Sequence, residues 1–467
     1  MERLNPLDAV FLEVEDGVTH MPIASCSVFE GPAPSYDDVV ASLAAKLPQI
    51  PRYRQRIHRV PLGLGRPVWV DDPGFDIRYH VRRTAVPAPG GEEEVRALMG
   101  RVMGVELDRR RPLWETWVVE GLEGGAWALI SKIHHCMVDG VSGTDLLSVA
   151  LDASPDAELP AVVPWTPEAQ PSSLQLVTDA VRDLVATPLR DLEHALPALR
   201  HPGRVVRRAA DLGRGARTIG AALRATPPTS VDGPIGPHRR WVPARATLDD
   251  VKLVKRAFGG TINDVVLAAV SGGWRALLLA RAEDPSEVVL RSLIPVSLRT
   301  ADARGVPDNR VSAIFLELPV EVADPVERLA EVRARMDDLK ASHEFEAGEV
   351  LTHLAGYLPA GLTAEALRLL TTTARTFGQR SCNTVVTNVP GPQQPLYLCG
   401  RRLVEHLPFV PLSHGVRIGT AVLTYDGKVA FGVTGDYDTA PDVGVLARGI
   451  EDAVAELVRL AEAEVAV

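Results

Sequence analysis

The sequence lacks the features that mark secreted, disulfide-stabilised and membrane-spanning proteins. Its 467 residues include only four cysteines, none with Cys-x-x-Cys or zinc-type spacing, so we expect reduced core thiols and neither a disulfide framework nor a structural zinc site. No run of about 18 apolar residues occurs, so a membrane-spanning helix is not expected. The N-terminus has acidic residues within its apolar part and no basic leader, which argues against a signal peptide. The four cysteines are Cys26, Cys136, Cys382 and Cys399.

An excess of positive charge is also missing. Lysine and arginine total 50 against 60 acidic residues, a formal charge of −10, which opposes non-specific binding to nucleic acid or to an anionic membrane. Hydrophobic residues make up 46% and charged residues 24%, which is close to the average for soluble proteins. The chain is about three times as long as a typical domain, and this length predicts two domains with separate cores.

Apolar spacing in the first part of the chain predicts two helices and a hairpin. Residues 35–47 place four apolar side chains on one face behind a serine N-cap, and residues 92–103 continue the helical spacing. Two apolar runs at 116–122 and 126–135 are separated by Glu-Gly-Gly and predict a β-hairpin. The second of these strands ends at a pair of histidines.

A Pro-, Ala- and Arg-rich stretch between about residues 152 and 240 predicts a linker with helical parts. We therefore divide the chain into an N-terminal domain (1–165), a helical linker (166–240) and a C-terminal domain (241–467). Arg204–Arg224 forms a basic amphipathic segment within the linker. In the last domain we expect helices at 248–257, 262–281, 325–340, 363–375 and 443–462, and strands at 288–298, 311–320, 383–388, 417–424 and 428–434.

The segment His134–Gly140 brings two imidazoles, one carboxylate and a glycine to the end of an apolar strand. Successive strand side chains face opposite sides, so one histidine should be buried while the other reaches a different environment. A neutral imidazole can take a proton from a hydroxyl and return it to a leaving group, as acyl transfer requires. Two alternatives remain: two histidines that merely end a buried strand, or a metal site formed with Asp139, which opposite strand faces disfavour. A Ser/His/Asp hydrolase is disfavoured because no Gly-x-Ser-x-Gly motif occurs.

This His-His-x-x-x-Asp-Gly motif resembles the active-site signature of the bacterial wax ester synthase/diacylglycerol acyltransferase family, and it also occurs in condensation domains of peptide synthetases. Further blocks resemble the first family, in its order and over nearly the whole chain, and favour it over the condensation domains. These blocks are LNPLDAVFL (4–12), PLW (112–114), PIGPHRR (234–240), TINDVVLAAV (261–270), PVSLR (295–299), NRVS (309–312) and TNVPGP (387–392).

The resemblance implies an α/β fold of two chloramphenicol-acetyltransferase-like domains, each a mixed β-sheet with helices, and a channel between them. It implies an O-acyltransferase that moves a long-chain acyl group from acyl-CoA to diacylglycerol, making triacylglycerol, and also to fatty alcohol, making wax ester. Acyl-CoA is then a co-substrate, and neither a bound cofactor nor a metal ion is expected. The alternatives are a carrier-protein donor, a secondary-metabolite acceptor, or a lipid-binding relative without catalysis.

The same resemblance suggests roles for the residues of the motif. His135 is the general base, and His134 packs behind it and orients the loop. Asp139 is structural and pairs with an arginine, for which Arg299 is our candidate; a solvated arginine at a strand end is an equal alternative for Arg299. Gly140 gives the backbone freedom that the turn after the strand needs.

Outside the motif, the resemblance points to two further groups of residues. Asn263 is a candidate donor to the oxyanion and Asp264 a candidate substrate contact, while their position alone reads as a helix N-terminus. Pro112, Leu113 and Trp114 are candidate substrate-channel residues, although such a sequence is ordinarily a core corner. The Asn-Val-Pro-Gly-Pro stretch at 388–392 reads as a stiff structural crossover.

Long-chain substrates are barely soluble in water, so we expect a cytoplasmic enzyme that works at the inner face of the plasma membrane or on lipid droplets without spanning a bilayer. The Arg204–Arg224 segment is the candidate docking helix, because arginine can contact lipid phosphates while apolar residues enter the interface. The same arginines could attract the phosphates of CoA, or the helix could pack on the protein with a solvated basic face. No nucleic-acid partner is expected, and the oligomeric state is left open.

Overall fold

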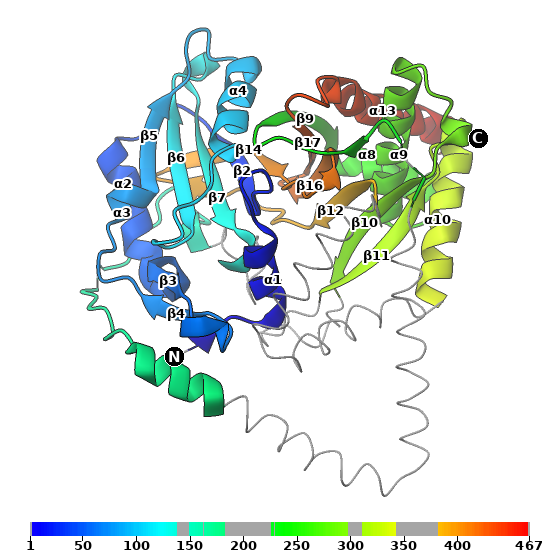
Figure 1. The fold of residues 1–467 in the computed structure, drawn as a ribbon. Coiled ribbons are helices and arrows are strands. Elements are labelled where there is room, and N and C mark those ends of the chain that lie inside the picture. The colour runs from blue at the N-terminus through cyan, green and yellow to red at the C-terminus, as the bar shows by residue number, and fades with distance from the viewer. Residues whose placement is uncertain are drawn as a thin grey trace, which may run out of the picture.

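The computed structural model describes residues 2–137, 149–161, 163–182, 226–227, 229–297, 311–341 and 382–465. Two halves lie side by side, each built on a six-stranded sheet (Figure 1). The blue and cyan N-terminal elements make up most of one half, together with orange strands from late in the chain, and most of the green, yellow and red elements make up the other. Both sheets mix parallel and antiparallel neighbours, as the predicted fold class requires.

The first sheet has the order β13-β14-β2-β7-β6-β5, in which only β5 and β6 run parallel. Helix α2 (Tyr36–Lys46) covers one face through Val39 and Val40, while α4 (Glu92–Met103) covers the other through Met99 and Met103. Its strands are β13 (Tyr397–Leu398), β14 (Arg401–Phe409), β2 (Pro22–Phe29), β7 (Trp127–His134), β6 (Trp114–Glu120) and β5 (Val81–Ala85).

The second sheet has the order β11-β10-β12-β16-β17-β9, with β10, β12 and β16 parallel to one another. Its core contains buried residues of four helices, α8 (Leu248–Phe258), α9 (Ile262–Ala280), α10 (Pro325–Ala341) and α13 (Val443–Val465). Its strands are β11 (Val311–Leu318), β10 (Leu290–Ser297), β12 (Thr384–Val389), β16 (Ile418–Tyr425), β17 (Lys428–Asp436) and β9 (Arg239–Thr247).

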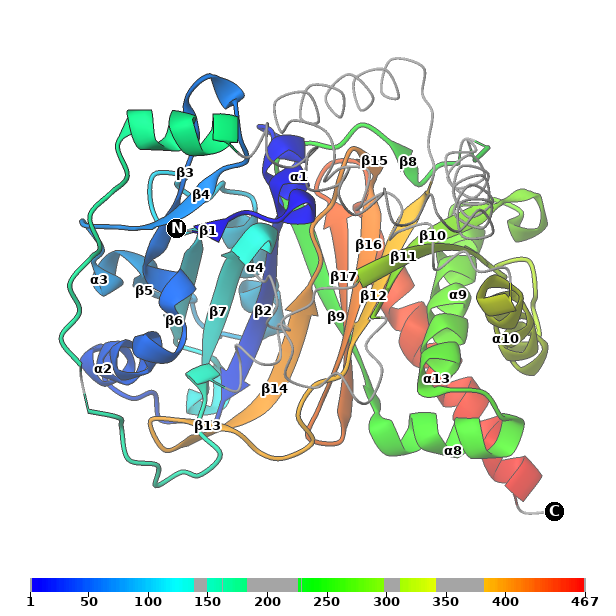
Figure 2. The ribbon, with the colours of Figure 1, turned by 90° about the horizontal axis from the view of Figure 1, so that it is seen from below.

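Strand β14 links the two halves. It lies late in the chain, yet it pairs antiparallel with β2 in the first sheet, and Figure 2 shows it between β2 and the strands of the second sheet. On its other side it contacts β16 and β17. The predicted domain division at residues 165 and 240 stays a prediction. It assigns β14 to the C-terminal domain by sequence, whereas β14 pairs with a strand of the first sheet.

The remaining elements are short. A helix at residues 173–182 precedes a part of the linker that lies outside the described residues. The short elements are α1 (Pro6–Val14), α3 (Ile77–His80), β1 (Glu2–Arg3), β3 (Gln55–His58), β4 (Val68–Asp71), β8 (Asp232–Gly233), β15 (Gly415–Val416), and the 3₁₀ turns η1 (Leu47–Gln49), η2 (Pro51–Arg54), η3 (Pro61–Gly63), η4 (Glu123–Gly125), η5 (His135–Met137) and η6 (Pro285–Glu287).

Most predicted elements occur where the periodicity indicated. The helix predicted at 92–103 is α4, and the predicted hairpin is β6-β7, joined through η4. The Ser35 hydroxyl accepts a hydrogen bond from the Asp38 N–H and caps α2, as expected of an N-cap. The helix predicted at 363–375 lies outside the described residues.

Of the helices that the structure describes, α9 is long and apolar enough to cross a bilayer by length and composition. However, 67% of its most apolar window is buried inside the protein, where α9 packs against α13. This burial is typical of the core helix of a domain.

Candidate active site

The hairpin β6-β7 carries the histidine motif to the edge of the first half. His134 is the last residue of β7, and its N–H donates to the Leu113 carbonyl at 2.9 Å. The chain then turns into η5, where the His135 N–H donates to the carbonyl of Met21, 3.0 Å away. The backbone of both histidines is therefore fixed by neighbouring segments.

The His134 ring is buried, with 1% of its side chain exposed. Its Nδ1 atom accepts a hydrogen bond from the Cys136 N–H at 3.2 Å, which requires a proton on Nε2 if the ring is neutral. His134 is therefore buried behind the end of β7, and its role in orienting the loop stays a prediction.

His135 is only partly buried; it begins η5 and lies beyond the strand, so the alternation of strand side chains does not apply to it. Its imidazole stacks on the Phe11 ring of α1, with centroids 3.9 Å apart. Burial of the imidazole, with the neighbouring His134 as a second cause, lowers the pKa of His135 to about 4. The ring is therefore neutral at physiological pH and able to accept a proton.

Glu15 is a residue of this site that the sequence analysis missed. It is the C-cap of α1, four residues after Phe11, and its carboxylate lies 3.4 Å from Nε2 of His134. Residues four apart share a face of a helix, so an aromatic ring and a carboxylate at this spacing were the available signal. Burial alone would raise the pKa of Glu15, but contacts from His134, the Met21 N–H and Arg109 outweigh it and lower the pKa to about 2.

Three of the predicted site residues lie outside the described residues. They are Asp139, Gly140 and Arg299. The proposed Asp139–Arg299 pair and the turn at Gly140 therefore stay predictions, as does the basic segment Arg204–Arg224.

Asn263 and Asp264 lie in the first turn of α9. The N-cap itself is Thr261, which forms a capping box with Asp264: the Thr261 N–H donates to the Asp264 carboxylate at 2.7 Å, and the Asp264 N–H donates to the Thr261 hydroxyl at 3.2 Å. Asp264 is buried and occupied by this cap, so its geometry favours a structural role over a substrate contact.

Asn263 is hydrogen-bonded by a residue of another family-like sequence block, TNVPGP (387–392). Its side-chain carbonyl accepts a hydrogen bond from Nδ2 of Asn388, 3.1 Å away, near the end of β12. This bond leaves the side-chain N–H groups of Asn263 available, and no acceptor for them is found in the described part of the chain. Asn263 and His135 share no hydrogen bond there, and the oxyanion role stays a prediction.

Pro112, Leu113 and Trp114 are all buried and form a core corner beside the motif. The indole Nε1 of Trp114 donates to the Tyr53 carbonyl at 2.8 Å, and its ring stacks on His80. Leu113 holds His134 through its backbone carbonyl. These contacts favour the structural reading, and a place in a substrate channel stays a prediction.

Within the described ranges, no group of three or more His, Cys, Asp or Glu side chains is arranged to hold a metal ion. None of the four cysteines forms a disulfide bond. Cys26 and Cys136 are buried, but Cys382 and Cys399 are only partly so, which corrects the expectation of four core residues.

Two of the cavities lined by described residues lie where the halves meet. One, of about 640 Å³, separates α4 from the start of β9 and α13 and is lined by Arg96, Arg101, Arg240 and Tyr437 among others. The other, of about 380 Å³, is mainly apolar and lies between β14 and the second sheet, beside Leu407. Neither is lined by His135, so the channel to the histidine stays an expectation.

Two family models match the chain. Residues 4–266 match the wax ester synthase/diacylglycerol acyltransferase catalytic domain, and residues 308–458 match the WS/DGAT C-terminal domain. A Mycobacterium tuberculosis H37Rv protein named as a diacylglycerol O-acyltransferase is 40% identical over 464 residues, which cover 99% of this chain and 97% of the relative.

Solved structures show the same fold. The wax ester synthase/diacylglycerol acyltransferase from Marinobacter aquaeolei VT8 superposes with a TM-score of 0.67 at 26% identity, covering 98% of this chain and all (100%) of that one. The first condensation domain of the calcium-dependent antibiotic synthetase has a TM-score of 0.56 at 14% identity over 98% of this chain and 95% of its own. The second similarity concerns the fold alone.

Proposed function

The chain belongs to the wax ester synthase/diacylglycerol acyltransferase family, and we propose that His135 is the general base of its acyl transfer. The protein is an O-acyltransferase that uses diacylglycerol as acceptor. The observation that carries the role of His135 is its environment: a partly buried imidazole at the end of β7, stacked on Phe11, with its pKa lowered to about 4. Such a ring is neutral at the pH of the cell and can accept a proton.

In the proposed reaction His135 takes the proton of the acceptor hydroxyl while its oxygen attacks the thioester carbonyl of acyl-CoA. The carbon–sulfur bond then breaks, the imidazolium returns the proton to the CoA thiolate, and ester and free CoA leave. The partial burial of the ring limits the solvation of the charged form and favours return of the proton.

We also propose that Asn263 stabilises the oxyanion formed on the thioester carbonyl. The hydrogen bond from Asn388 fixes the side-chain carbonyl of Asn263, which leaves its N–H groups as donors. Fatty alcohol is proposed as a second acceptor, because the same proton transfer serves any primary or secondary hydroxyl.

The test is an assay with radiolabelled palmitoyl-CoA and either diolein or hexadecanol, comparing the wild type with His135→Ala. We expect ester from the wild type and a loss of about a hundredfold or more in the variant, because general-base catalysis contributes about 10² to 10⁴. Asn263→Ala, assayed alongside, should lower kcat at unchanged thermal stability. Near-wild-type ester formation by a folded His135→Ala variant would exclude His135 as the base.

If the folded wild-type protein formed no ester with either acceptor, a different donor or acceptor would have to be considered. A carrier-protein thioester as donor, or a specialised hydroxyl compound as acceptor, would then be tested in place of palmitoyl-CoA and diolein. A protein inactive with all of these would fit a lipid-binding relative.

We further propose that the enzyme works on the cytoplasmic face of the plasma membrane or on lipid droplets, docked by the basic segment Arg204–Arg224. Its support is the chemistry of the substrates and the amphipathic sequence. Flotation with anionic liposomes should fall when the six arginines of this segment are replaced by glutamine. A matched control replaces the exposed Arg78, Arg83 and Arg110 and should float like the wild type. Equal flotation of both variants would reject this docking site.

A further inference from the structure

The loop between α1 and β2 places one buried carboxylate against the histidine motif. Glu15 opens this loop, and only 4% of its side chain is exposed. Its oxygens accept from the Met21 N–H at 3.0 Å and from the Arg109 guanidinium at 2.7 and 3.2 Å, and Oε2 lies 3.4 Å from Nε2 of His134. Every one of these partners is a donor, which suits an ionised carboxylate.

Glu15 acts on His134 directly. Because the Cys136 N–H occupies Nδ1 of His134, the ring presents its Nε2 proton to Glu15. The ring is thus held at both nitrogens, by the backbone on one side and by a negative charge on the other. At 3.4 Å the attraction is electrostatic, and burial of both side chains strengthens it.

Glu15 acts on His135 through one peptide group. The Met21 N–H donates to Glu15, and the Met21 carbonyl accepts from the His135 N–H at 3.0 Å. Both histidines of the motif are therefore positioned from one carboxylate, the first by contact and the second through Met21. Phe11, four residues earlier on the same helix, packs on the His135 ring.

We propose that Glu15 is a positioning residue for His135, holding the histidine pair in the geometry that proton transfer needs. The inference rests on the proposed function of His135 as base. A glutamine in its place has one acceptor oxygen and an NH₂ group, so at least one of the donors around it would face another donor.

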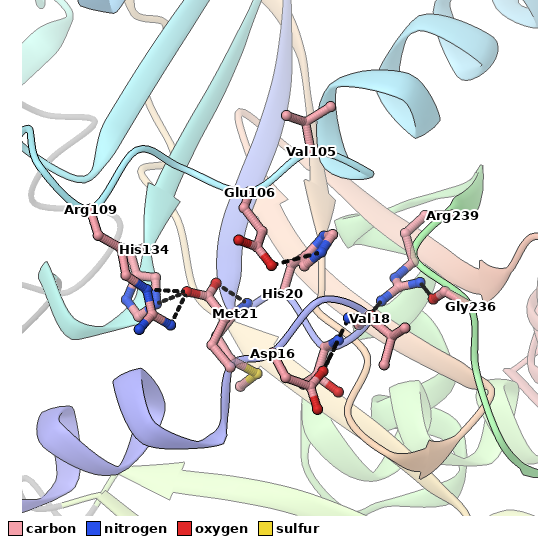
Figure 3. Close-up of polar contacts among 12 residues, drawn as sticks. Asp16, Val18, His20, Met21, Val105, Glu106, Arg109, His134, Gly236 and Arg239 are labelled. Atoms are coloured by element: carbon pink, nitrogen blue, oxygen red, sulfur yellow. Dashed lines mark hydrogen bonds and ion pairs between the residues drawn. The ribbon is translucent and has the colours of Figure 1, made fainter.

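The neighbouring Asp16 gives a matched comparison. It lies on the same loop and contacts His414 of the second half at 2.7 Å, and its own pKa is also lowered to about 2. The Val18 carbonyl accepts a hydrogen bond from Arg239, so the far side of the loop is anchored to the second half (Figure 3). Asp16→Asn therefore removes a carboxylate of the same loop that bonds His414 of the second half.

The experiment measures kcat, KM for palmitoyl-CoA and thermal stability for Glu15→Gln, Asp16→Asn and His135→Ala. We expect Glu15→Gln to lose about tenfold to a hundredfold in kcat with KM within about twofold, since a displaced base forfeits part of the 10² to 10⁴ of general-base catalysis. Asp16→Asn should keep kcat within about twofold, whatever its stability. The inference is overturned if Glu15→Gln keeps wild-type kcat, or if kcat in both loop variants falls only in step with stability.

A second pair of variants covers the case in which Glu15→Gln does not fold. His134→Asn keeps an acceptor for the Cys136 N–H but does not reach Glu15, whereas the longer His134→Gln can reach it. We expect His134→Asn to lose kcat as Glu15→Gln does, and His134→Gln to recover most of it. Wild-type kcat in folded His134→Asn would overturn the inference.

These experiments distinguish failure of the proposed base, His135, from failure of the proposed positioning role of Glu15. An active His135→Ala variant removes the base itself and so the proposed function. An inactive His135→Ala variant beside a fully active Glu15→Gln variant leaves the base in place and removes only the role of Glu15. A double variant of Glu15→Gln and His134→Asn should be no worse than the poorer single variant, because both break one interaction.

Discussion

The imidazole of His135 accepts a proton only when it is neutral, so its pKa determines how the reaction depends on pH. Burial, with His134 as a second cause, lowers that pKa to about 4, against about 6.5 for an ordinary histidine. We predict that kcat/KM stays constant from about pH 8 down to pH 5 and is halved only near pH 4. Initial rates measured at a series of pH values, with palmitoyl-CoA well below KM, give kcat/KM and show the pH at which it falls.

The acid side of this profile needs a stability control. Glu15 and Asp16 have folded pKa values of about 2, below those of the unfolded chain, so their contribution to folding is complete above about pH 5 and is lost as the pH falls towards 2. Intrinsic fluorescence at each pH reports whether the enzyme is still folded. If kcat/KM of the folded enzyme already fell by half near pH 6.5, the result would contradict a buried base at His135.

At the scale of elements, the sequence predicted what local periodicity determines. Helix α4 and the hairpin β6-β7 depend on apolar spacing over a dozen residues or fewer, and they occur close to the predicted bounds. The start of α9 was also predicted from the sequence, although its N-cap residue is Thr261 and not the Asn263-Asp264 pair that follows it. Local hydrogen bonding sets such features, so one sequence is sufficient to find them.

Contacts between segments that are far apart in the sequence could not be predicted from it. Strand β14 was not predicted, because its partner β2 lies more than 370 residues earlier: Leu407, for example, pairs with Cys26. The support of His134 by Glu15 was missed for the same reason, since it depends on α1 packing against η5. The histidine motif itself was found because its residues are adjacent in sequence.

At the scale of the whole molecule, the two halves are held together where β14 lies against β9 and β17. Arg245 of β9 pairs with Glu405 of β14 at 2.7 Å and with Glu92 of α4 at 2.8 Å. The Trp241 indole donates to the Pro408 carbonyl at 2.9 Å, buried between the halves. This close approach depends on a glycine, because a Cβ atom on Gly432 of β17 would lie 1.7 Å from that same carbonyl oxygen.

We predict that Gly432→Ala destabilises the protein by about 1–3 kcal/mol, the usual cost of overpacking a well-filled interior. The added methyl group has to displace β14, and the bond between Trp241 and Pro408 is lost with it. Urea denaturation followed by tryptophan fluorescence measures the change. Because β14 also pairs with β2, which leads back to Met21, ester formation should fall together with stability.

Gly444→Ala is the matched control for this substitution. Gly444 lies in the first turn of α13, where a Cβ atom would meet Arg448 at an ordinary 3.5 Å, so alanine should leave stability unchanged or raise it by up to about 1 kcal/mol. If Gly432→Ala were as stable as Gly444→Ala, the contact between β14 and β17 would not be tight, and the packing of these two strands would contribute little to holding the halves together. The difference between the two variants therefore measures how far the packing of β14 on the second sheet holds the halves in register.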